Sequence, residues 1–210
     1  PGAVAGWMTL HERFGKLPLE EVMAPAIRYA EKGYPVTPNI SRLWQEAFEN
    51  YSKYRDRPEF QGWFDTFAPN NTWLKPGEMF RCPDMAKTLK EIAATKGEAF
   101  YRGAIAEKID AFFKKHNGFL TKEDLAAFKP EWVDPISVNY HGVDVWELPP
   151  NGHGITVLMA LQILKDMNLA ERDCADTMHK QIEAMKLAMV DTAEYVAEPS
   201  FMRVSVDQLL

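Results

Sequence analysis

Four consecutive residues, Asn151, Gly152, His153 and Gly154, combine a titratable side chain with an open backbone. The imidazole of His153 can exchange a proton near neutral pH. The two glycines let a bound group approach the backbone closely, and a helix that begins here presents free N–H groups to an anion. These four residues are therefore the candidate binding site. A purely structural turn explains the same residue types, and both interpretations stay open at this point.

Two further patterns have a chemical interpretation. His179 and Glu183 lie four residues apart on a predicted helix, so both side chains can face one metal ion. The sequence offers no evident third or fourth ligand, and such spacing usually means a local side-chain pair. Pro1 would be a general base only as a free terminus in a short β-rich domain, which does not suit a long helical chain. We expect no metal site and no cofactor.

Composition narrows the class of protein. The chain has 210 residues, 46% of them hydrophobic and 26% charged, which is typical of a soluble globular protein. Its formal net charge of −6 argues against nucleic acid as a partner. No apolar run approaches the roughly 20 residues that span a bilayer. Cys82 and Cys174 are far apart in the sequence, so neither a disulfide framework nor a zinc-binding cysteine pair is predicted.

The candidate turn lies between a predicted strand and a predicted helix. Residues 143–148 alternate in polarity and stop at Pro149-Pro150, and residues 132–140 form a second strand that pairs with them through His141-Gly142. Residues 154–167 are apolar almost all round, which predicts a helix enclosed by other elements. A long helix is predicted over residues 176–196. Residues 131–210 thus contain a strand pair, a central helix and a long helix.

Residues 1–130 are predicted to be mainly helical. Gly15 is expected to end the first helix in the left-handed conformation, and Pro25 to interrupt the second. Thr37 and Thr121 are predicted helix N-caps. Residues 55–78 contain several prolines, glycines and bulky aromatics, and we expect two extended pieces joined by turns, with the aromatics packed on neighbouring helices. Helix should exceed strand at least twofold in the whole chain.

Several stretches together resemble one family. They are PGAVAGW (1–7), FGKLPLEEVMAPAIRYAEKGYPV (14–36), EAFYRGAIAEKI (98–109), NGFLTKEDLAAF (117–128), VNYHGVDVWELPPNGHG (138–154) and EAMKLAMVDTAEYVAEPSF (183–201). In this order they are similar to the middle and later part of the large subunit of the γ-glutamyltranspeptidase family. The resemblance covers essentially the whole chain.

The resemblance implies a helix-rich α+β fold that forms part of the αββα sandwich of an amino-terminal-nucleophile hydrolase. Residues 1–210 would be a single large-subunit fragment. In this family a precursor cuts itself and exposes a threonine, whose hydroxyl attacks a γ-glutamyl or similar amide. That threonine and the other substrate-holding residues match no position here, so no catalytic role is transferred. The implied partners are the remainder of the large subunit and the small subunit that carries the nucleophile.

The turn refines this expectation. Glutathione-handling members carry a serine pair after the two prolines, whereas Asn151-Gly152-His153-Gly154 resembles the acylase-like branch. Residues 151–154 are therefore expected near a γ-glutamyl or other acyl-amide substrate. The compartment stays open, since members are often periplasmic or secreted and acylase-like ones also occur in the cytoplasm. The alternative function is an inert helical interaction domain. For a fragment, uncovered apolar surface predicts self-association.

Overall fold

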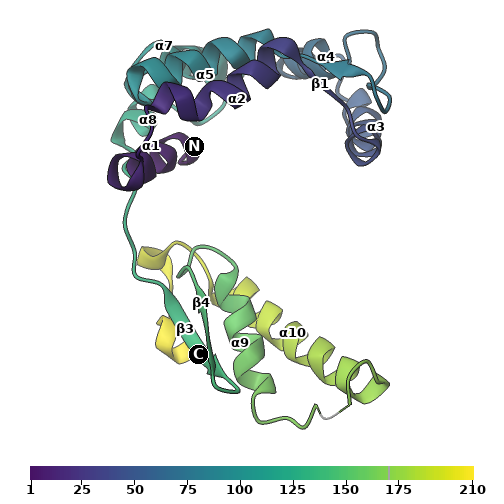
Figure 1. Cartoon of the computed structure of the whole chain (residues 1–210), viewed down its shortest axis with the longest axis vertical. Coiled ribbons are helices and arrows are strands. Elements are labelled where there is room, and N and C mark those ends of the chain that lie inside the picture. Colours follow the sequence, from purple (N-terminus) through teal and green to yellow (C-terminus); the bar gives the residue numbers. More distant parts are fainter. Residues whose placement is uncertain (170) are drawn as a thin grey trace. The chain divides into compact units, whose positions relative to one another are not determined.

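The computed structural model describes residues 1–169 and 171–210, which divide into two compact units, Pro1–Pro130 and Glu131–Leu210 (Figure 1). Helices dominate both units. The strands of the described part are two or five residues long, whereas the longest helix has 21 residues, so the predicted excess of helix over strand is confirmed. Within the described residues, no helix combines the length and the apolar character needed to cross a membrane.

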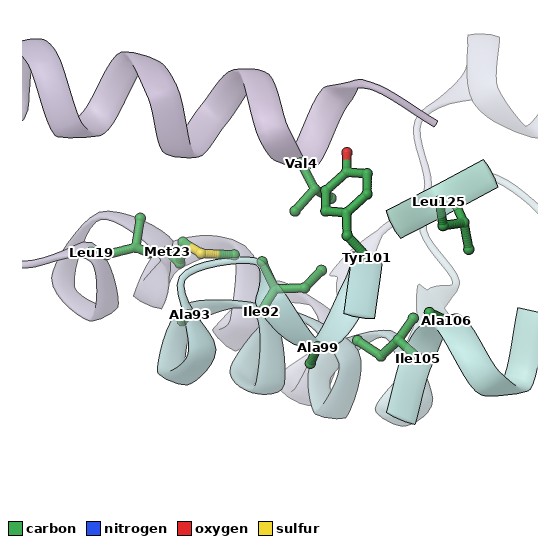
Figure 2. Close-up of a cluster of buried hydrophobic side chains, with 10 residues drawn as sticks. All are labelled: Val4, Leu19, Met23, Ile92, Ala93, Ala99, Tyr101, Ile105, Ala106 and Leu125. Carbon is green, nitrogen blue, oxygen red and sulfur yellow. The ribbon is translucent and has the colours of Figure 1, made fainter. Parts of the chain in front are cut away.

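The first unit is a helical body with one shared core. Its helices are α1 (Ala3–Phe14), α2 (Leu19–Lys32), α5 (Pro83–Thr95), α6 (Glu98–Arg102), α7 (Ala104–Lys115) and α8 (Lys122–Ala127). Figure 2 shows the ten buried side chains that these six helices contribute. Leu125 of α8 is fully buried, which stabilises the fold by about 1.5–3 kcal/mol relative to an exposed leucine. Tyr101 of α6 stacks on Phe128 and reaches α1 through its hydroxyl.

Two sequence predictions about this body are wrong. Gly15 follows α1 in an extended conformation (φ −65°, ψ 134°), not the left-handed one. Its N–H donates to the His11 carbonyl, and a Cβ there would lie 2.4 Å from that oxygen, so close approach explains the glycine. Pro25 lies inside α2 without ending it. It is on the exposed side, where water can bind the carbonyl that loses its N–H partner, while Leu19 and Met23 are buried in the core.

An aromatic arm extends from this body. It comprises α3 (Pro38–Ser52), η1 (Pro58–Phe60) and α4 (Gln61–Phe67), and is joined to the body by the antiparallel pair β1 (Tyr34–Pro35) and β2 (Met79–Phe80). Figure 1 shows α3 and α4 at one end of the body. The expected extended pieces are wrong for residues 61–67, which are helical. Phe60, Trp63, Phe64 and Phe67 follow helical spacing and contact aromatic side chains of α3, as the packing prediction stated.

The predicted helix caps are confirmed. The Thr37 hydroxyl accepts a hydrogen bond from the Ile40 N–H at 3.4 Å, at the start of α3. Thr121 and Asp124 form a reciprocal capping box at the start of α8. The hydrogen bond from the Thr121 hydroxyl lowers the pKa of the Asp124 carboxyl below its ordinary value. Such caps satisfy N–H groups that have no partner within the helix.

The second unit contains the predicted hairpin. Strands β3 (Ile136–Tyr140) and β4 (Val143–Glu147) pair antiparallel, with Tyr140 opposite Val143. His141 and Gly142 form the turn at positive φ, as a two-residue hairpin requires. The first strand is shorter than predicted: it begins at Ile136, and residues 132–135 lie outside it. Pro135 cannot donate a ladder hydrogen bond, which accounts for a start at Ile136.

One helix packs against this hairpin, and a second helix packs against the first. They are α9 (Gly154–Leu164) and the long α10 (Ala175–Tyr195), followed by η2 (Pro199–Phe201) and α11 (Val206–Leu209). Ile155 and Leu158 of α9 are fully buried, so the prediction of an enclosed helix is confirmed, although the helix ends at Leu164 and not at residue 167. Helix α10 presents small side chains to α9, and Ala188 belongs to the same buried cluster as Ile155. The second core is therefore built between α9, α10 and β3.

Candidate functional site

The candidate turn lies where β4 leads into α9. Pro150 is buried, whereas Asn151, Gly152 and His153 are exposed, and the Pro150–Asn151 peptide bond is cis. His153 occupies the N-cap position of α9 without a side-chain capping bond, and its carbonyl accepts a hydrogen bond from the Thr156 N–H at 3.1 Å. The structure thus brings the predicted residues together at one open turn, where the imidazole is not used as a helix cap.

Glu147, the last residue of β4, lies directly against this turn. A Cβ atom added to Gly154 would lie 2.5 Å from Glu147 Oε2 and 2.9 Å from Glu147 Cβ. Glycine is therefore required at the first position of α9 while this side chain is in place. The carboxylate lies at the amino end of the helix, where the helix dipole favours negative charge.

The contribution of Glu147 was not predicted from the sequence, although a signal was present. The alternation of the strand puts residues 143, 145 and 147 on one face. Glu147 is paired with Ile136, which packs against the α9 core. The carboxylate therefore points to the helix side of the hairpin, toward the residues selected from the sequence.

The turn can bind and orient a polar group, but residues 151–154 contain no hydroxyl or thiol nucleophile. The nearest hydroxyl in the sequence belongs to Thr156, which is buried. Its Oγ1 lies 2.7 Å from Thr192 Oγ1, so this hydroxyl is used in helix packing. The imidazole and the carboxylate can hold or move a proton, and covalent catalysis would need a residue from elsewhere.

His179 and Glu183 have no third metal ligand beside them among the described residues. His179 is exposed on α10, and Glu183 accepts a hydrogen bond from Lys186 Nζ at 2.7 Å. That bond lowers the pKa of the Glu183 carboxyl. In the part of the chain that the structure describes, no three His, Cys, Asp or Glu side chains are grouped so that they could hold a metal ion. The spacing therefore reflects neighbouring positions on one helix.

Two other residues considered from the sequence have structural contacts. The Pro1 carbonyl accepts a hydrogen bond from the Tyr101 hydroxyl at 2.5 Å, which ties the start of α1 to α6. Cys82 and Cys174 are free thiols. Cys174 is the N-cap of α10, and its sulfur accepts a hydrogen bond from the Thr177 N–H at 3.4 Å. Hydrogen bonding with the side chain and then the backbone of Thr177 lowers the pKa of the Cys174 thiol.

Comparison with known proteins identifies the family. The family model described as Gamma-glutamyltranspeptidase matches residues 1–210, the whole chain. The chain belongs to the gamma-glutamyltranspeptidase family. A curated relative is the glutathione hydrolase proenzyme of Pseudomonas aeruginosa, which is 33% identical over 214 residues. That match covers 100% of this chain and 37% of the relative, so the chain spans little more than a third of the relative's length.

Solved structures of related proteins share the helix-rich α+β fold. Cephalosporin acylase from Bacillus halodurans is 53% identical with a TM-score of 0.96, and the match covers 100% of this chain and 39% of that one. Helicobacter pylori gamma-glutamyltranspeptidase is 30% identical with a TM-score of 0.87, and the match covers 100% of this chain and 59% of that one. The solved relatives of this chain therefore include an acylase as well as a gamma-glutamyltranspeptidase.

Proposed function

We propose that residues 1–210 are part of the large subunit of a proenzyme that hydrolyses or transfers a γ-glutamyl or related acyl group. The observation that carries this proposal is the family match over the whole chain. The relative from P. aeruginosa is a glutathione hydrolase proenzyme, and this chain covers 37% of it. The remaining parts of the large subunit and a small subunit are the partners in this proposal.

The proposed chemistry follows the family resemblance. A threonine that becomes amino-terminal on autoprocessing uses its own amine as base, and its hydroxyl attacks the amide carbon. The amine of the substrate leaves, and the acyl-enzyme then passes its acyl group to water or to an amino acid. The threonines of this chain have acylated nitrogens and cannot use that arrangement. We assign no catalytic residue to this chain and no cofactor to the reaction.

Residues 151–154 are the part of this chain that we place near the substrate. Three features support the assignment: Asn151, Gly152 and His153 are exposed, the α9 amino end carries no side-chain cap, and Glu147 lies against Gly154. These groups would bind and orient the acyl amide while the threonine performs the attack. The 53% identity to cephalosporin acylase supports an acyl amide other than glutathione as an equally suitable substrate.

The finer architecture in this proposal is part of an αββα sandwich. The β3–β4 hairpin has α9 against one face, and Trp146 and Leu148 project from the other with exposures of 58% and 66%. A second sheet from the remaining polypeptide would cover these side chains, as layered folds require. Without it, the isolated chain should self-associate, because monomers seldom leave large apolar patches uncovered.

Activity on paired substrates tests the proposal. The full-length parent protein should release p-nitroaniline from γ-glutamyl-p-nitroanilide or from glutaryl-p-nitroanilide, which lacks the α-amino group. The isolated 210-residue chain should give a flat trace with both. His153→Ala in the parent should raise KM or lower kcat, with Asp56→Asn in the aromatic arm as a charge-changing control. A parent protein that hydrolyses neither amide would refute the proposed function. Turnover by the isolated chain that His153→Ala abolishes would instead place an active site at the turn.

A further inference from the structure

The first unit contains an open cavity of about 560 Å³ at the turn between α1 and α2. Residues of α1, of the start of α2 and of the end of α5 surround it. Its volume lies within the roughly 300–1,000 Å³ that is usual for small-molecule sites in proteins. The turn at residues 151–154 belongs to the second unit, so the candidate site described above does not include this cavity.

The floor of the cavity is apolar. Leu19 of α2 and Ala93 of α5 are buried members of the core of the first unit (Figure 2), and Met8 of α1 packs against that core. The floor is therefore held in place by the fold. Such a surface suits an aliphatic part of a ligand, because burial of apolar area against it is favourable.

His11 fixes one wall of the cavity. Its Nε2 lies 2.8 Å from the Leu17 carbonyl oxygen, and since a carbonyl can only accept, Nε2 is the donor. Gly15 passes so close that a Cβ there would lie 2.8 Å from the same nitrogen. The imidazole thus ties the end of α1 to the segment that leads into α2. This wall is formed by the protein alone and does not need a ligand to order it.

Charges of both signs border the cavity. Glu12 and Glu20 supply carboxylates, and Lys96 supplies an ammonium. Within the described residues, none of these three side chains makes an ion pair or a hydrogen bond. The opposite charges therefore do not neutralise one another, although they line one cavity. A ligand that carries both an ammonium and a carboxylate can form charge-assisted hydrogen bonds with both kinds of group.

We propose that this cavity binds a free α-amino acid with an aliphatic side chain. The ammonium of the ligand pairs with Glu12 and Glu20, its carboxylate pairs with Lys96, and its side chain covers the apolar floor. A simple amine would satisfy the two glutamates and leave Lys96 without a partner. Binding of an amino acid here does not require the amide chemistry of the proposed function.

Three related ligands test the charge requirement. Equilibrium dialysis of the full-length parent with radiolabelled L-leucine should show saturable binding. N-acetyl-L-leucine lacks the ammonium and 3-methylbutylamine lacks the carboxylate, so each should compete at least about tenfold more weakly than unlabelled L-leucine. Absence of saturable L-leucine binding would overturn the proposal. So would competition by either analogue as strong as that of L-leucine, since one charge would then be sufficient.

Matched variants locate the binding. Lys96→Asn should weaken L-leucine binding at least about tenfold, and so should the double variant Glu12→Gln with Glu20→Gln. Asparagine suits the left-handed conformation of residue 96 (φ 49°), and all three side chains are exposed, so the thermal unfolding temperature should stay near that of the wild type. The controls are Lys129→Asn and Glu21→Gln, exposed positions that do not line the cavity.

The outcome separates this cavity from every other amino-acid site of the parent. L-leucine binding that is unchanged in Lys96→Asn and in the double variant lies elsewhere and would overturn the proposal. An equal loss of binding in the two controls would also overturn it, because a general effect of charge would then be the cause. Amide hydrolysis by the same preparations is measured separately, so failure of the proposed function and failure of this inference are distinguished.

Discussion

The hydroxyl oxygens of Thr156 and Thr192 lie 2.7 Å apart between α9 and α10, where both residues are buried. Thr192 also donates to the Ala188 carbonyl at 2.7 Å, so its proton is in use and Thr156 must be the donor between the two threonines. The Thr192 oxygen is therefore the acceptor for the buried Thr156 hydroxyl. Thr192 does not depend on Thr156 in return, because its own hydroxyl donates to the Ala188 carbonyl.

Replacement of the two threonines by valine should show that inequality. Thr192→Val leaves the buried Thr156 hydroxyl without its acceptor and should lower the free energy of unfolding by about 1–3 kcal/mol. Thr156→Val leaves Thr192 still bonded to Ala188 and should cost less. The double variant should be no less stable than Thr192→Val, because it removes the stranded hydroxyl. Urea unfolding followed by circular dichroism measures all three, and additive losses would contradict this hydrogen-bond direction.

Alanine at Gly154 should destabilise the start of α9. The added methyl would lie 2.5 Å from Glu147 Oε2, and overpacking of this kind costs about 1–3 kcal/mol. Gly152→Ala is the matched control, because a Cβ at residue 152 meets no atom within 4 Å. Combining Gly154→Ala with Glu147→Ala should recover part of the loss. Thermal unfolding of the four proteins checks the order, and equal stability of the two glycine variants would argue against the contact.

Stability at acid pH should depend on Asp110. A hydrogen bond from the Lys114 ammonium, at 2.6 Å, lowers the pKa of this carboxyl, and the Lys122 N–H also donates to it. Because the pKa is lowered in the folded state, the contribution is complete above the unfolded value of about 4 and is lost as the pH falls through the folded value. Asp110→Asn should therefore flatten the fall in stability below about pH 4. Asp56→Asn, an exposed change of the same charge, should leave that slope in place.

Removal of the Tyr101 hydroxyl should loosen the start of α1. The hydroxyl donates to the Pro1 carbonyl at 2.5 Å and accepts from the Ala5 N–H at 3.0 Å, while the ring is 4% exposed. Tyr101→Phe keeps the ring and should cost about 0.5–1.5 kcal/mol for each bond lost. Amide exchange at Ala5 should accelerate, as NMR can measure. Tyr51→Phe is the control, since that hydroxyl makes no hydrogen bond within the described residues, and equal effects would rule out this role.

The second unit was largely predictable from its sequence. The prediction rested on local patterns. Alternation over residues 143–147 predicted strand β4, Pro149-Pro150 predicted its end, and the apolar run after Gly154 predicted helix α9. Within the aromatic arm, the helix α4 was not predicted, because Pro58 and Gly62 outweighed the helical spacing of the four aromatics at residues 60–67. Proline at the first turn of η1 is compatible with a helical start, and stacking on α3 stabilises α4 despite Gly62.

The candidate site was predictable in composition but not in arrangement. Residues 151–154 carry their own signal of histidine between glycines after two prolines. Glu147 becomes their neighbour only through the strand register and the entry angle of α9, which are tertiary features. The exposed apolar side chains of α10, such as Ile182 and Met189, show the opposite difficulty, because apolar spacing alone does not tell whether a helix face meets its own chain or another segment.

The short β1–β2 ladder makes the aromatic arm an insertion with adjoining ends. Tyr34 is paired with Phe80, the Val36 N–H donates to the Glu78 carbonyl at 2.9 Å, and the Gly77 N–H donates to the Val36 carbonyl at 2.8 Å. The chain thus leaves the body after α2 and re-enters before α5 at one place. An insertion or deletion within residues 37–76 leaves the adjoining ends of the arm and the α2–α5 contact in place, so we expect changes of length to be tolerated there.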